Sequence, residues 1–282
     1  MSSQRAPFSV QVVAEGVYAC VPGDGTANAG FIVGEDGVVV IDTLTTPSQA
    51  RWLLASVREV THAPIRYVVN THWHGDHTFG NQQFRPAGVV AHGTCRDDLM
   101  AGWESTHALL TRLYPQLRDE LGQVSMDLPD LTFLESVTLH VGRQPVELRY
   151  LGRGHTRGDI VALLPHQGVL FAGDLAFHGY IPSMQDSYPS RWIDVVDEVA
   201  RFGLPTVVPG HGPVGGTDDL REMRDCLTHI VEEARRGFAA GKSPEATLAG
   251  LSMGRFASWG RQADRLPPGV ERVYRELSGE LD

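Results

Sequence analysis

Residues 72–77 of the chain read His-Trp-His-Gly-Asp-His, which places three imidazoles and one carboxylate on one short stretch. Zinc and similar divalent cations bind neutral imidazole nitrogens and carboxylate oxygens at about 2.0–2.2 Å. The chain has 12 histidines in 282 residues, so three of them within six positions are a local concentration. A solvated polar loop is the alternative interpretation, and the concentration favours a metal site over it.

The order of residues within this stretch predicts two sets of ligands. If the chain is still extended at His72 and His74, these two side chains point the same way and can reach one ion. Gly75 then permits a sharp turn. After that turn, Asp76 and His77 can reach a second ion beside the first.

Three later segments each carry a histidine or an aspartate directly after an apolar run. His155 follows residues 146–151, Asp174 follows residues 169–172, and His211 follows residues 206–208. Taken singly, each of these residues could be a turn or cap residue. Together they repeat one arrangement, in which a buried strand delivers one side chain to a glycine-bearing loop, where functional groups concentrate.

The full pattern is His-x-His-x-Asp-His followed by a distant His, a distant Asp and a final His. It resembles the signature of the metallo-β-lactamase-fold hydrolase superfamily, over about residues 10–215 of this chain. The resemblance implies two metal sites joined by one carboxylate. The implied ligands are His72, His74 and His155 for one ion, Asp76, His77 and His211 for the other, and Asp174 as the bridge.

The residue at position 174 distinguishes branches of that superfamily. A bridging Asp174 is similar to the glyoxalase II-like and lactonase-like branch, whereas some true metallo-β-lactamases place a cysteine there. Cys20, Cys95 and Cys226 all lie away from the ligand loops in the sequence, so a thiolate ligand is not expected. The expected cofactors are two divalent ions, Zn²⁺ first, with Fe or Mn as alternatives because histidine and carboxylate ligands suit all three.

The function that the resemblance implies is metal-dependent hydrolysis, in which a dinuclear metal-bound hydroxide cleaves a small ester, thioester, lactone or amide of the β-lactam kind. Two cations about 3.5–4 Å apart make hydroxide available near neutral pH, and one of them polarises the carbonyl. Asp76 is expected to be catalytic as well, by orienting the water or moving its proton. Asp42 and Asn81 are expected to fix the orientation of the imidazoles.

Three other functions are compatible with parts of the pattern. An iron-dependent oxidoreductase would resemble the persulfide dioxygenases, but those proteins use one iron and this chain has a complete second ligand set. A phosphodiesterase would resemble RNase Z, but the formal net charge of −10 disfavours a polyanionic substrate. A non-catalytic binding protein would not need an intact ligand set.

Composition restricts the partners. The chain has 24 Lys and Arg against 34 Asp and Glu, without a basic cluster, so no nucleic acid is expected. No run approaches the roughly 20 apolar residues of a membrane span, and residues 1–7 lack the apolar stretch of a secretion signal. We therefore expect a cytoplasmic protein with a small-molecule substrate. The sequence does not predict its oligomeric state.

The fold class that the resemblance implies is α/β, a four-layer αββα sandwich of two mixed β-sheets flanked by helices. Strand-like runs at residues 8–13, 17–21, 30–33 and 38–41 indicate an antiparallel start. A helix is expected at residues 47–60, with Thr46 as its cap and Pro47 at its first position. Residues 66–70 then form the strand that leads to His72.

An internal repeat supports two similar halves. Residues 37–72 run strand, Asp42, helix, strand, His72, and residues 168–211 run strand, Asp174, helix, strand, His211. The helix of the second half is expected at residues 191–202, started by Ser190 and ended by Gly203. Chance similarity of two apolar strands is the alternative, because buried strands draw on few residue types.

We expect one domain over residues 1–282, with a helical insertion at about 94–127 and C-terminal helices at about 217–282. The insertion either packs on the core or forms one wall of the substrate pocket. Residues 177–188 are expected to contribute to that pocket, with His178 and Tyr180 as substrate contacts. The identity of the substrate does not follow from the sequence, because metal ligands specify how water is activated and not what is bound.

Overall fold

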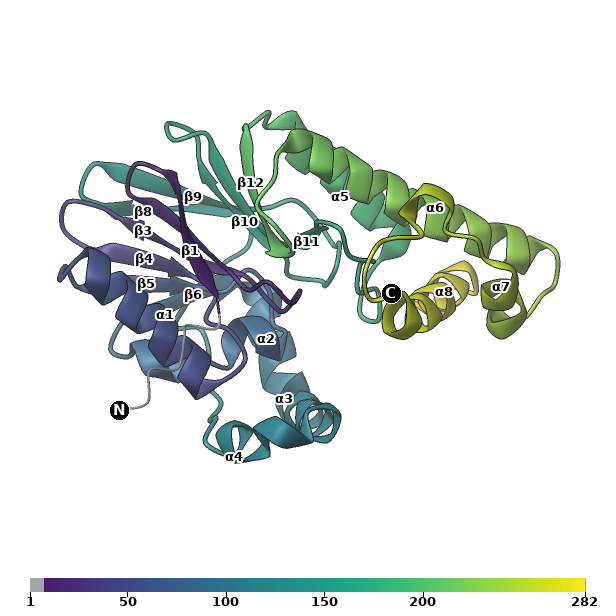
Figure 1. The fold of residues 1–282 in the computed structure, drawn as a ribbon, viewed down its shortest axis with the longest axis horizontal. Coiled ribbons are helices and arrows are strands. Elements are labelled where there is room, and N and C mark those ends of the chain that lie inside the picture. Colours follow the sequence, from purple (N-terminus) through teal and green to yellow (C-terminus); the bar gives the residue numbers. More distant parts are fainter. Residues whose placement is uncertain (1–7, 282) are drawn as a thin grey trace.

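Short runs of valine, isoleucine and phenylalanine form two β-sheets that lie face to face (Figure 1). The computed structural model describes residues 8–281, so the expectation about a secretion signal, which concerns residues 1–7, lies outside the described residues. Helices pack on the outer face of each sheet. The predicted four-layer αββα sandwich is therefore confirmed. The assignment of the chain to one domain stays a prediction.

The first sheet contains seven strands in sequence order. They are β1 (Ser9–Ala14), β2 (Val17–Val21), β3 (Ala29–Val33), β4 (Val38–Ile41), β5 (Ile65–Val69), β6 (Gly88–His92) and β7 (Leu131–Phe133). The first four strands pair antiparallel, and β4 to β7 pair parallel. The antiparallel start that the sequence predicts is confirmed.

The second sheet contains five strands in the order β12-β11-β10-β9-β8. They are β8 (Ser136–Val141), β9 (Gln144–Tyr150), β10 (Ile160–Leu164), β11 (Val169–Phe177) and β12 (Thr206–His211). All neighbours pair antiparallel except β11 and β12, which are parallel. Each sheet is therefore mixed, and each contains a parallel pair joined by a helix.

Side-chain alternation along the buried strands assigns each residue to one of three apolar layers. In β11, Val169 and Phe171 pack in the core between the sheets, whereas Leu170 and Ala172 pack against the outer helices. In β4, Val39 points into the core between the sheets and Val40 points to the opposite face. Strands buried on both faces read as continuous apolar runs, which is why the sequence marks them clearly.

Helix α1 (Pro47–Val60) covers the outer face of the first sheet. Thr46 accepts a hydrogen bond from the Gln49 backbone N–H, and the Gln49 side chain accepts one from the Thr46 backbone, which completes a capping box. Leu53 and Val57 on its inner face are fully buried. The predicted start, cap and end of this helix are confirmed.

Helix α5 (Pro189–Arg201) covers the second sheet and joins β11 to β12. The predicted start at residue 191 with Ser190 as its cap is wrong. The helix begins at Pro189, whose fixed backbone angle suits a first helical position, and the Ser190 hydroxyl bonds instead to Glu276. The predicted stop is confirmed, because Gly203 adopts a left-handed conformation with φ +64° just beyond the helix.

The insertion after β6 is largely helical from residue 93 to 121. It consists of α3 (Gly93–Leu113), a short 3-10 turn, and α4 (Arg118–Leu121). Only Cys95 and Leu99 of α3 are buried, so this helix lies on the surface. One end of it borders the metal-ligand stretch, since a Cβ at Gly75 would lie 2.9 Å from Leu110.

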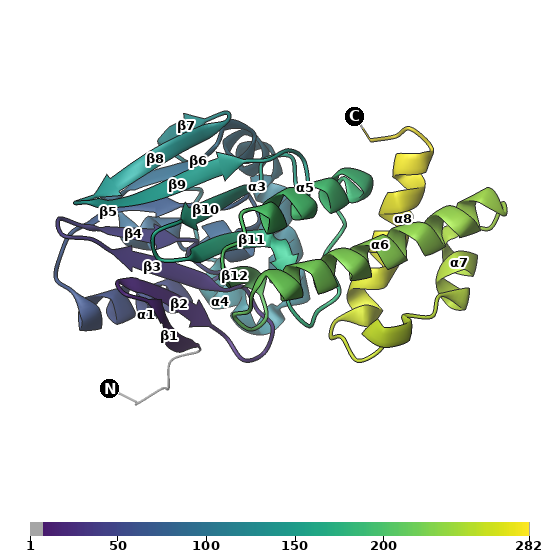
Figure 2. The ribbon, with the colours of Figure 1, turned by 90° about the horizontal axis from the view of Figure 1, so that it is seen from above.

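Three C-terminal helices form an arm that projects from one end of the sandwich (Figure 1, Figure 2). They are α6 (Thr217–Ala239), α7 (Pro244–Gly250) and α8 (Gln262–Leu277). Helix α6 packs on α5, and α8 packs on α6 and α5. Between residues 8 and 281, no helix combines the length and the apolar character that crossing a bilayer requires.

The three cysteines provide a test of this packing. Burial raises the pKa of Cys20 and of Cys226 to about 12, and it raises the pKa of Cys95 well above the usual thiol value. Because the thiolate is the reactive form, we expect the folded protein at pH 8 to show no fast-reacting thiol in an Ellman assay. All three should react in denaturant. A thiol that reacts within seconds in the folded protein would contradict this packing.

Candidate metal centre

Four chain segments meet at one edge of the sandwich, each at or near the end of a strand. His72 lies three residues after β5, His155 follows β9, Asp174 lies in β11, and His211 ends β12. Helix α2 (Gly75–Thr78) starts directly after His74 and turns Asp76 and His77 back toward the same edge. Parallel strand pairs present their carboxyl ends together, which is why residues far apart in sequence converge here.

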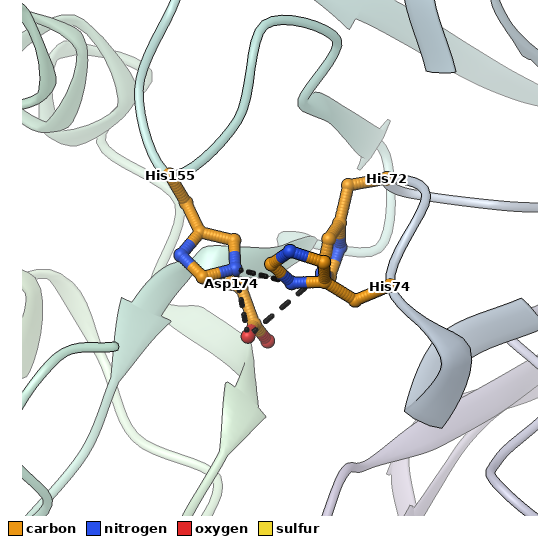
Figure 3. Close-up of side chains that lie close together, drawn as sticks. All are labelled: His72, His74, His155 and Asp174. Carbon is orange, nitrogen blue, oxygen red and sulfur yellow. Dashed lines mark hydrogen bonds and ion pairs between the residues drawn. The ribbon is translucent and has the colours of Figure 1, made fainter. Parts of the chain in front are cut away.

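Two groups of side chains come together at this edge. The first contains His72, His74, His155 and Asp174, and the second contains Asp76, His77 and His211. Within each group the potential ligand atoms, one from each residue, all lie within 4.8 Å of one another. Figure 3 shows the first group, with dashed lines from Asp174 to His155 and to His72, and from His155 to His74. The structure thus brings together all seven residues that the sequence singles out.

The carboxylate of Asp174 lies between the two groups. Its Oδ2 is 3.3 Å from the Nε2 atoms of both His155 and His211, and its Oδ1 is 3.1 Å from His77 Nε2. A β-bulge at Gly173, with φ +52°, delivers it to this position. A Cβ at Gly173 would approach the Thr71 hydroxyl to 2.5 Å, so only glycine fits.

Several buried polar atoms in these groups lack a hydrogen-bond partner among residues 8–281. They are His72 Nε2, His77 Nε2 and Asp174 Oδ1, of which the last two lie 3.1 Å apart but outside the geometry of a hydrogen bond. A buried polar atom without a partner costs about 1–3 kcal/mol, so native proteins rarely leave three together. Imidazole nitrogens and a carboxylate oxygen at this spacing are a donor set that divalent cations accept. The residues therefore fit a metal centre.

The second nitrogen of each imidazole is held by the surrounding protein. The contacts are His72 Nδ1 with Thr71 Oγ1 at 3.1 Å, His74 Nε2 with Asp186 Oδ2 at 3.0 Å, His77 Nδ1 with Asp42 Oδ2 at 2.8 Å, His155 Nδ1 with the Ser183 carbonyl at 2.8 Å, and His211 Nδ1 with the Gly25 carbonyl at 3.0 Å. When these nitrogens donate, the opposite nitrogens present lone pairs to the centre.

Asp42 fixes both the His77 ring and the backbone before His72. It accepts hydrogen bonds from the Thr71 N–H at 2.8 Å and from the Thr71 hydroxyl at 2.7 Å, besides its contact with His77. Its backbone has φ +56°, a strained conformation for a non-glycine residue. The predicted role of Asp42 in orienting an imidazole is confirmed.

The same prediction for Asn81 is wrong. Its side-chain oxygen accepts from Thr43 and from Asn70, and both of these residues also donate to the His77 carbonyl. Asn81 therefore supports the backbone of the ligand stretch, and the structure gives it no contact with an imidazole.

Burial and mutual charge set the ionisation of the groups. Burial lowers the pKa of His155 to about 3 and holds the pKa of His72 well below its usual value. Burial also opposes ionisation of Asp174, but the surrounding histidines outweigh it and hold the pKa of this carboxyl well below its usual value.

Burial opposes charge on His77 and His74 as well. At His77, Asp174 and Asp76 outweigh burial and raise the pKa of the imidazole well above its usual value. At His74, Asp186 outweighs burial and raises the pKa. A cation that binds here would therefore displace protons from these two imidazoles, because metal ligands must be deprotonated.

Asp186 is the contact that the sequence did not reveal. It lies 112 positions from its partner His74, on the loop between β11 and α5, where neither the end of the strand nor Gly179 adjoins it in sequence. Burial raises the pKa of Asp186, but the hydrogen bond from His74 outweighs this and lowers it. The only signal was that the expected pocket segment, residues 177–188, contains it.

The two expected substrate contacts lie outside the metal-ligand groups. The ring of His178 is 3% exposed, and its Nδ1 lies 3.0 Å from the Pro213 carbonyl. The ring of Tyr180 packs between Gly25 and Gly260, so close that a Cβ on either glycine would lie within 2.8 Å of it. The Gly25 carbonyl also contacts His211, so Tyr180 is separated from a proposed ligand by one residue. Substrate contact by either residue stays a prediction.

Comparison with known proteins gives one matching family and several relatives. The family model described as the metallo-beta-lactamase superfamily matches residues 22–211. A type 2 metallo-beta-lactamase of Bacteroides fragilis is 25% identical over 224 residues, which is 78% of this chain and 80% of that protein. A linear primary-alkylsulfatase of a Pseudomonas species is 24% identical over 253 residues, which is 76% of this chain and 48% of that protein.

Two solved structures share the fold. A metallo-beta-lactamase from Pontibacter korlensis has a TM-score of 0.63 at 24% identity, covering 78% of this chain and 99% of that one. A sec-alkylsulfatase from a Pseudomonas species has a TM-score of 0.74 at 18% identity, covering 95% of this chain and 50% of that one. The chain therefore spans about half the length of the alkylsulfatases that it matches.

The orienting contact of Asp42 is testable through metal affinity. Asp42→Asn removes the charged acceptor of His77 but leaves all seven proposed ligands in place. We therefore expect zinc affinity to fall about 10- to 100-fold. Competition with a chromophoric chelator measures it. Asp36→Asn, at an exposed surface ion pair with Arg66, is the matched control and should leave affinity unchanged. Unaltered zinc affinity in a folded Asp42→Asn protein would refute the orienting role.

Proposed function

The chain belongs to the metallo-β-lactamase superfamily, whose named relatives are hydrolases, and on this premise we propose that it is a dinuclear metallohydrolase acting on a small acyl-type substrate. The bond that it cleaves is that of an ester, thioester, lactone or amide. The single observation that supports two ions over one is the position of Asp174, whose two oxygens each lie within 3.3 Å of a ring nitrogen.

The proposed ligands divide between the two ions as the structure groups them. His72, His74 and His155 would hold one ion, Asp76, His77 and His211 the other, and Asp174 would contribute to both. Zn²⁺ is the proposed metal, because it accepts histidine and carboxylate ligands in flexible geometry. When bound, a pair of divalent ions supplies water activation and polarisation of the substrate carbonyl.

Asp76 is the residue that we assign to proton handling. Its side chain is 33% exposed, whereas those of the other six proposed ligands are between 0 and 11% exposed. Burial raises the pKa of Asp76, but His77 and His211 outweigh it and lower the pKa, so the carboxylate is ionised at neutral pH. An ionised carboxylate that faces solvent can orient a water molecule and accept its proton.

A second candidate function is hydrolysis of a sulfate ester. The alkylsulfatase structure covers 95% of this chain, and the metallo-beta-lactamase structure covers 78%. The arm built from α6, α7 and α8 lies beyond residue 211, the last residue that the family model matches. The alkylsulfatase structure therefore matches more of this chain than the metallo-beta-lactamase structure does. This larger match favours the relative that is named as a sulfatase.

A substrate panel with metal analysis tests both candidates. Protein reconstituted with zinc should contain about two equivalents of metal and hydrolyse at least one ester, thioester, lactone, β-lactam or alkyl sulfate. Removal of the metal by a chelator should abolish turnover, and added zinc should restore it. Metal-replete, folded protein without turnover on the whole panel would count against hydrolysis. One equivalent of iron with oxygen-dependent turnover would favour the oxidoreductase, and turnover of a generic phosphodiester would favour the phosphodiesterase.

The role of Asp76 predicts a loss in kcat. Asp76→Asn keeps the size of the side chain but removes its charge, so we expect kcat to fall by at least about 100-fold. Steady-state kinetics at saturating zinc measures it, with metal content determined in parallel. Asp218→Asn, at a 95% exposed position on α6, is the control and should match the unaltered protein. An Asp76→Asn protein with full metal and full activity would exclude this assignment.

A further inference from the structure

Solvent reaches the metal-ligand groups at one side. Asp76 is the most exposed of the seven residues, and His74 follows with 11% of its side chain exposed. Asp186, which accepts a hydrogen bond from His74, has a side chain that is 41% exposed. A substrate that approaches this side therefore meets Asp76, His74 and Asp186 first.

A cavity of about 320 Å³ adjoins this opening, and Asp186 belongs to both. The volume is at the lower end of the range of small-molecule sites, about 300–1,000 Å³. The lining comes from the ligand stretch, from α3, from the loops after β9 and β11, and from α8. It consists of Trp73, Asp98, Ala101, Gly102, Thr156, Arg157, Asp186, Tyr188 and Arg272.

Most charges in this cavity already have partners. Arg157 forms an ion pair with Asp98, and Asp186 accepts from His74. Both carboxylates of the lining, Asp98 and Asp186, therefore have partners, and so does the guanidinium of Arg157. The remaining charged side chain is Arg272.

Arg272 presents unused donors. Its Nε donates to the Ser187 carbonyl at 2.6 Å, and its guanidinium lies 5.7 Å from the centre of the Tyr188 ring. Within residues 8–281 its two terminal nitrogens donate to no protein group; Asp186 and Glu276 attract the guanidinium, but neither carboxylate forms an ion pair with it. The guanidinium is half-buried and is held through its Nε, so its two terminal nitrogens are available as donors. Such a planar pair of donors matches the two oxygens of a carboxylate in shape and charge.

We propose that this cavity binds a carboxylate-bearing part of the substrate and that Arg272 is the residue that selects for it. This rests on the proposed hydrolase function and adds a substrate class to it, namely small acyl compounds with a carboxylate remote from the scissile bond. Trp73 and Tyr188 contribute apolar walls to the cavity for the intervening carbon chain. Asp76 lies close enough to His74 for their charges to interact, and the scissile bond would be placed beside these two residues.

The family assignment says nothing about Arg272, which is why the structure is needed to find it. The family model ends at residue 211, and Arg272 lies on α8 in the C-terminal arm. Three contacts hold α8 against the pocket loop. Arg265 donates to the Ile181 carbonyl at 2.8 Å, Gly269 packs against Met184, and Arg272 itself donates to Ser187.

A pair of esters of equal length tests the proposal. The mono-para-nitrophenyl ester of glutaric acid carries a carboxylate where para-nitrophenyl pentanoate carries a methyl group. With zinc-loaded full-length protein, Arg272→Gln should raise KM for the glutarate ester about 10- to 50-fold more than KM for the pentanoate. The pentanoate accounts for any shift of the loop that Arg272 Nε holds at Ser187. Spontaneous hydrolysis is subtracted from both. Equal changes for the two esters, or no change for either, would overturn the proposal.

Arg275→Gln provides the matched control. Arg275 lies on the same helix, is exposed, and bonds to Glu280 away from the cavity, so the same change in charge and size is made outside the site. It should leave both KM values unaltered. An equal effect of Arg275→Gln on the glutarate ester would show that only long-range charge matters, and the proposal would fail.

A binding measurement separates this proposal from the hydrolase function itself. The para-nitroanilides of glutaric and pentanoic acid are amide analogues of the two esters, and calorimetry with the chelator-treated, metal-free protein reports their affinity without turnover. We expect the glutaric anilide to bind about 10-fold or more tightly than the pentanoic one, and Arg272→Gln to remove the difference. If neither ester is hydrolysed but this preference holds, the pocket assignment stands and the hydrolase proposal fails for these esters. Equal affinity of the two anilides would reject the pocket assignment.

The cavity itself can be filled as an independent check. Ala101 is exposed on α3 and lines the cavity, so Ala101→Trp should remove the preference for the glutaric anilide. Ala108, exposed two turns further along the same helix, does not line it, and Ala108→Trp should keep the preference. Retention of the preference in a folded Ala101→Trp protein would place the carboxylate site elsewhere.

Discussion

The burial of an ionised carboxylate among imidazoles is the interaction on which the rest of the site depends. Asp174 is 3% exposed, and leaving water costs an ion several kcal/mol unless opposite charge or strong donors replace the solvent. Four histidine nitrogens lie within 3.9 Å of its oxygens, and a nitrogen that presents its lone pair there cannot donate to the carboxylate. Bound cations would then supply the compensating positive charge. The outer contacts of the five rings follow from this, because each ring must present a lone pair inward.

The two halves of the sandwich solve the same positioning problem in the same way. In each half a parallel strand pair is joined by a helix, β4-α1-β5 before His72 and β11-α5-β12 before His211. The aspartates that the repeat predicted have diverged in role. Asp42 orients His77 from outside the centre, whereas Asp174 lies within it, because a glycine bulge in β11 moves its carboxylate inward. The predicted repeat is thus confirmed in the order of elements.

Sequence reasoning succeeded where a local pattern dictates the structure, and failed where a contact is non-local. Thr46 and Pro47 identify the start of α1 by themselves, and the run at Val38–Ile41 can only be a strand buried on both faces. Asp186 and Arg272 carry no such local signal, since their partners lie 112 and 85 positions away. The prediction that Ser190 caps α5 failed because its hydroxyl donates to Glu276 instead, and because the helix already begins at Pro189.

The arm has a closer relation to the metal centre than its place at the end of the molecule suggests. Residues 181–188 run along α8 and are fixed to it through the contacts of Arg265 and Arg272. That same segment supplies the Ser183 carbonyl to His155 and the Asp186 carboxylate to His74. Two of the five contacts that orient the imidazoles therefore depend on a loop whose backbone is held by the arm. The proposed water activation and substrate selection use different parts of the chain. This loop connects them, because it contacts both the imidazoles and α8.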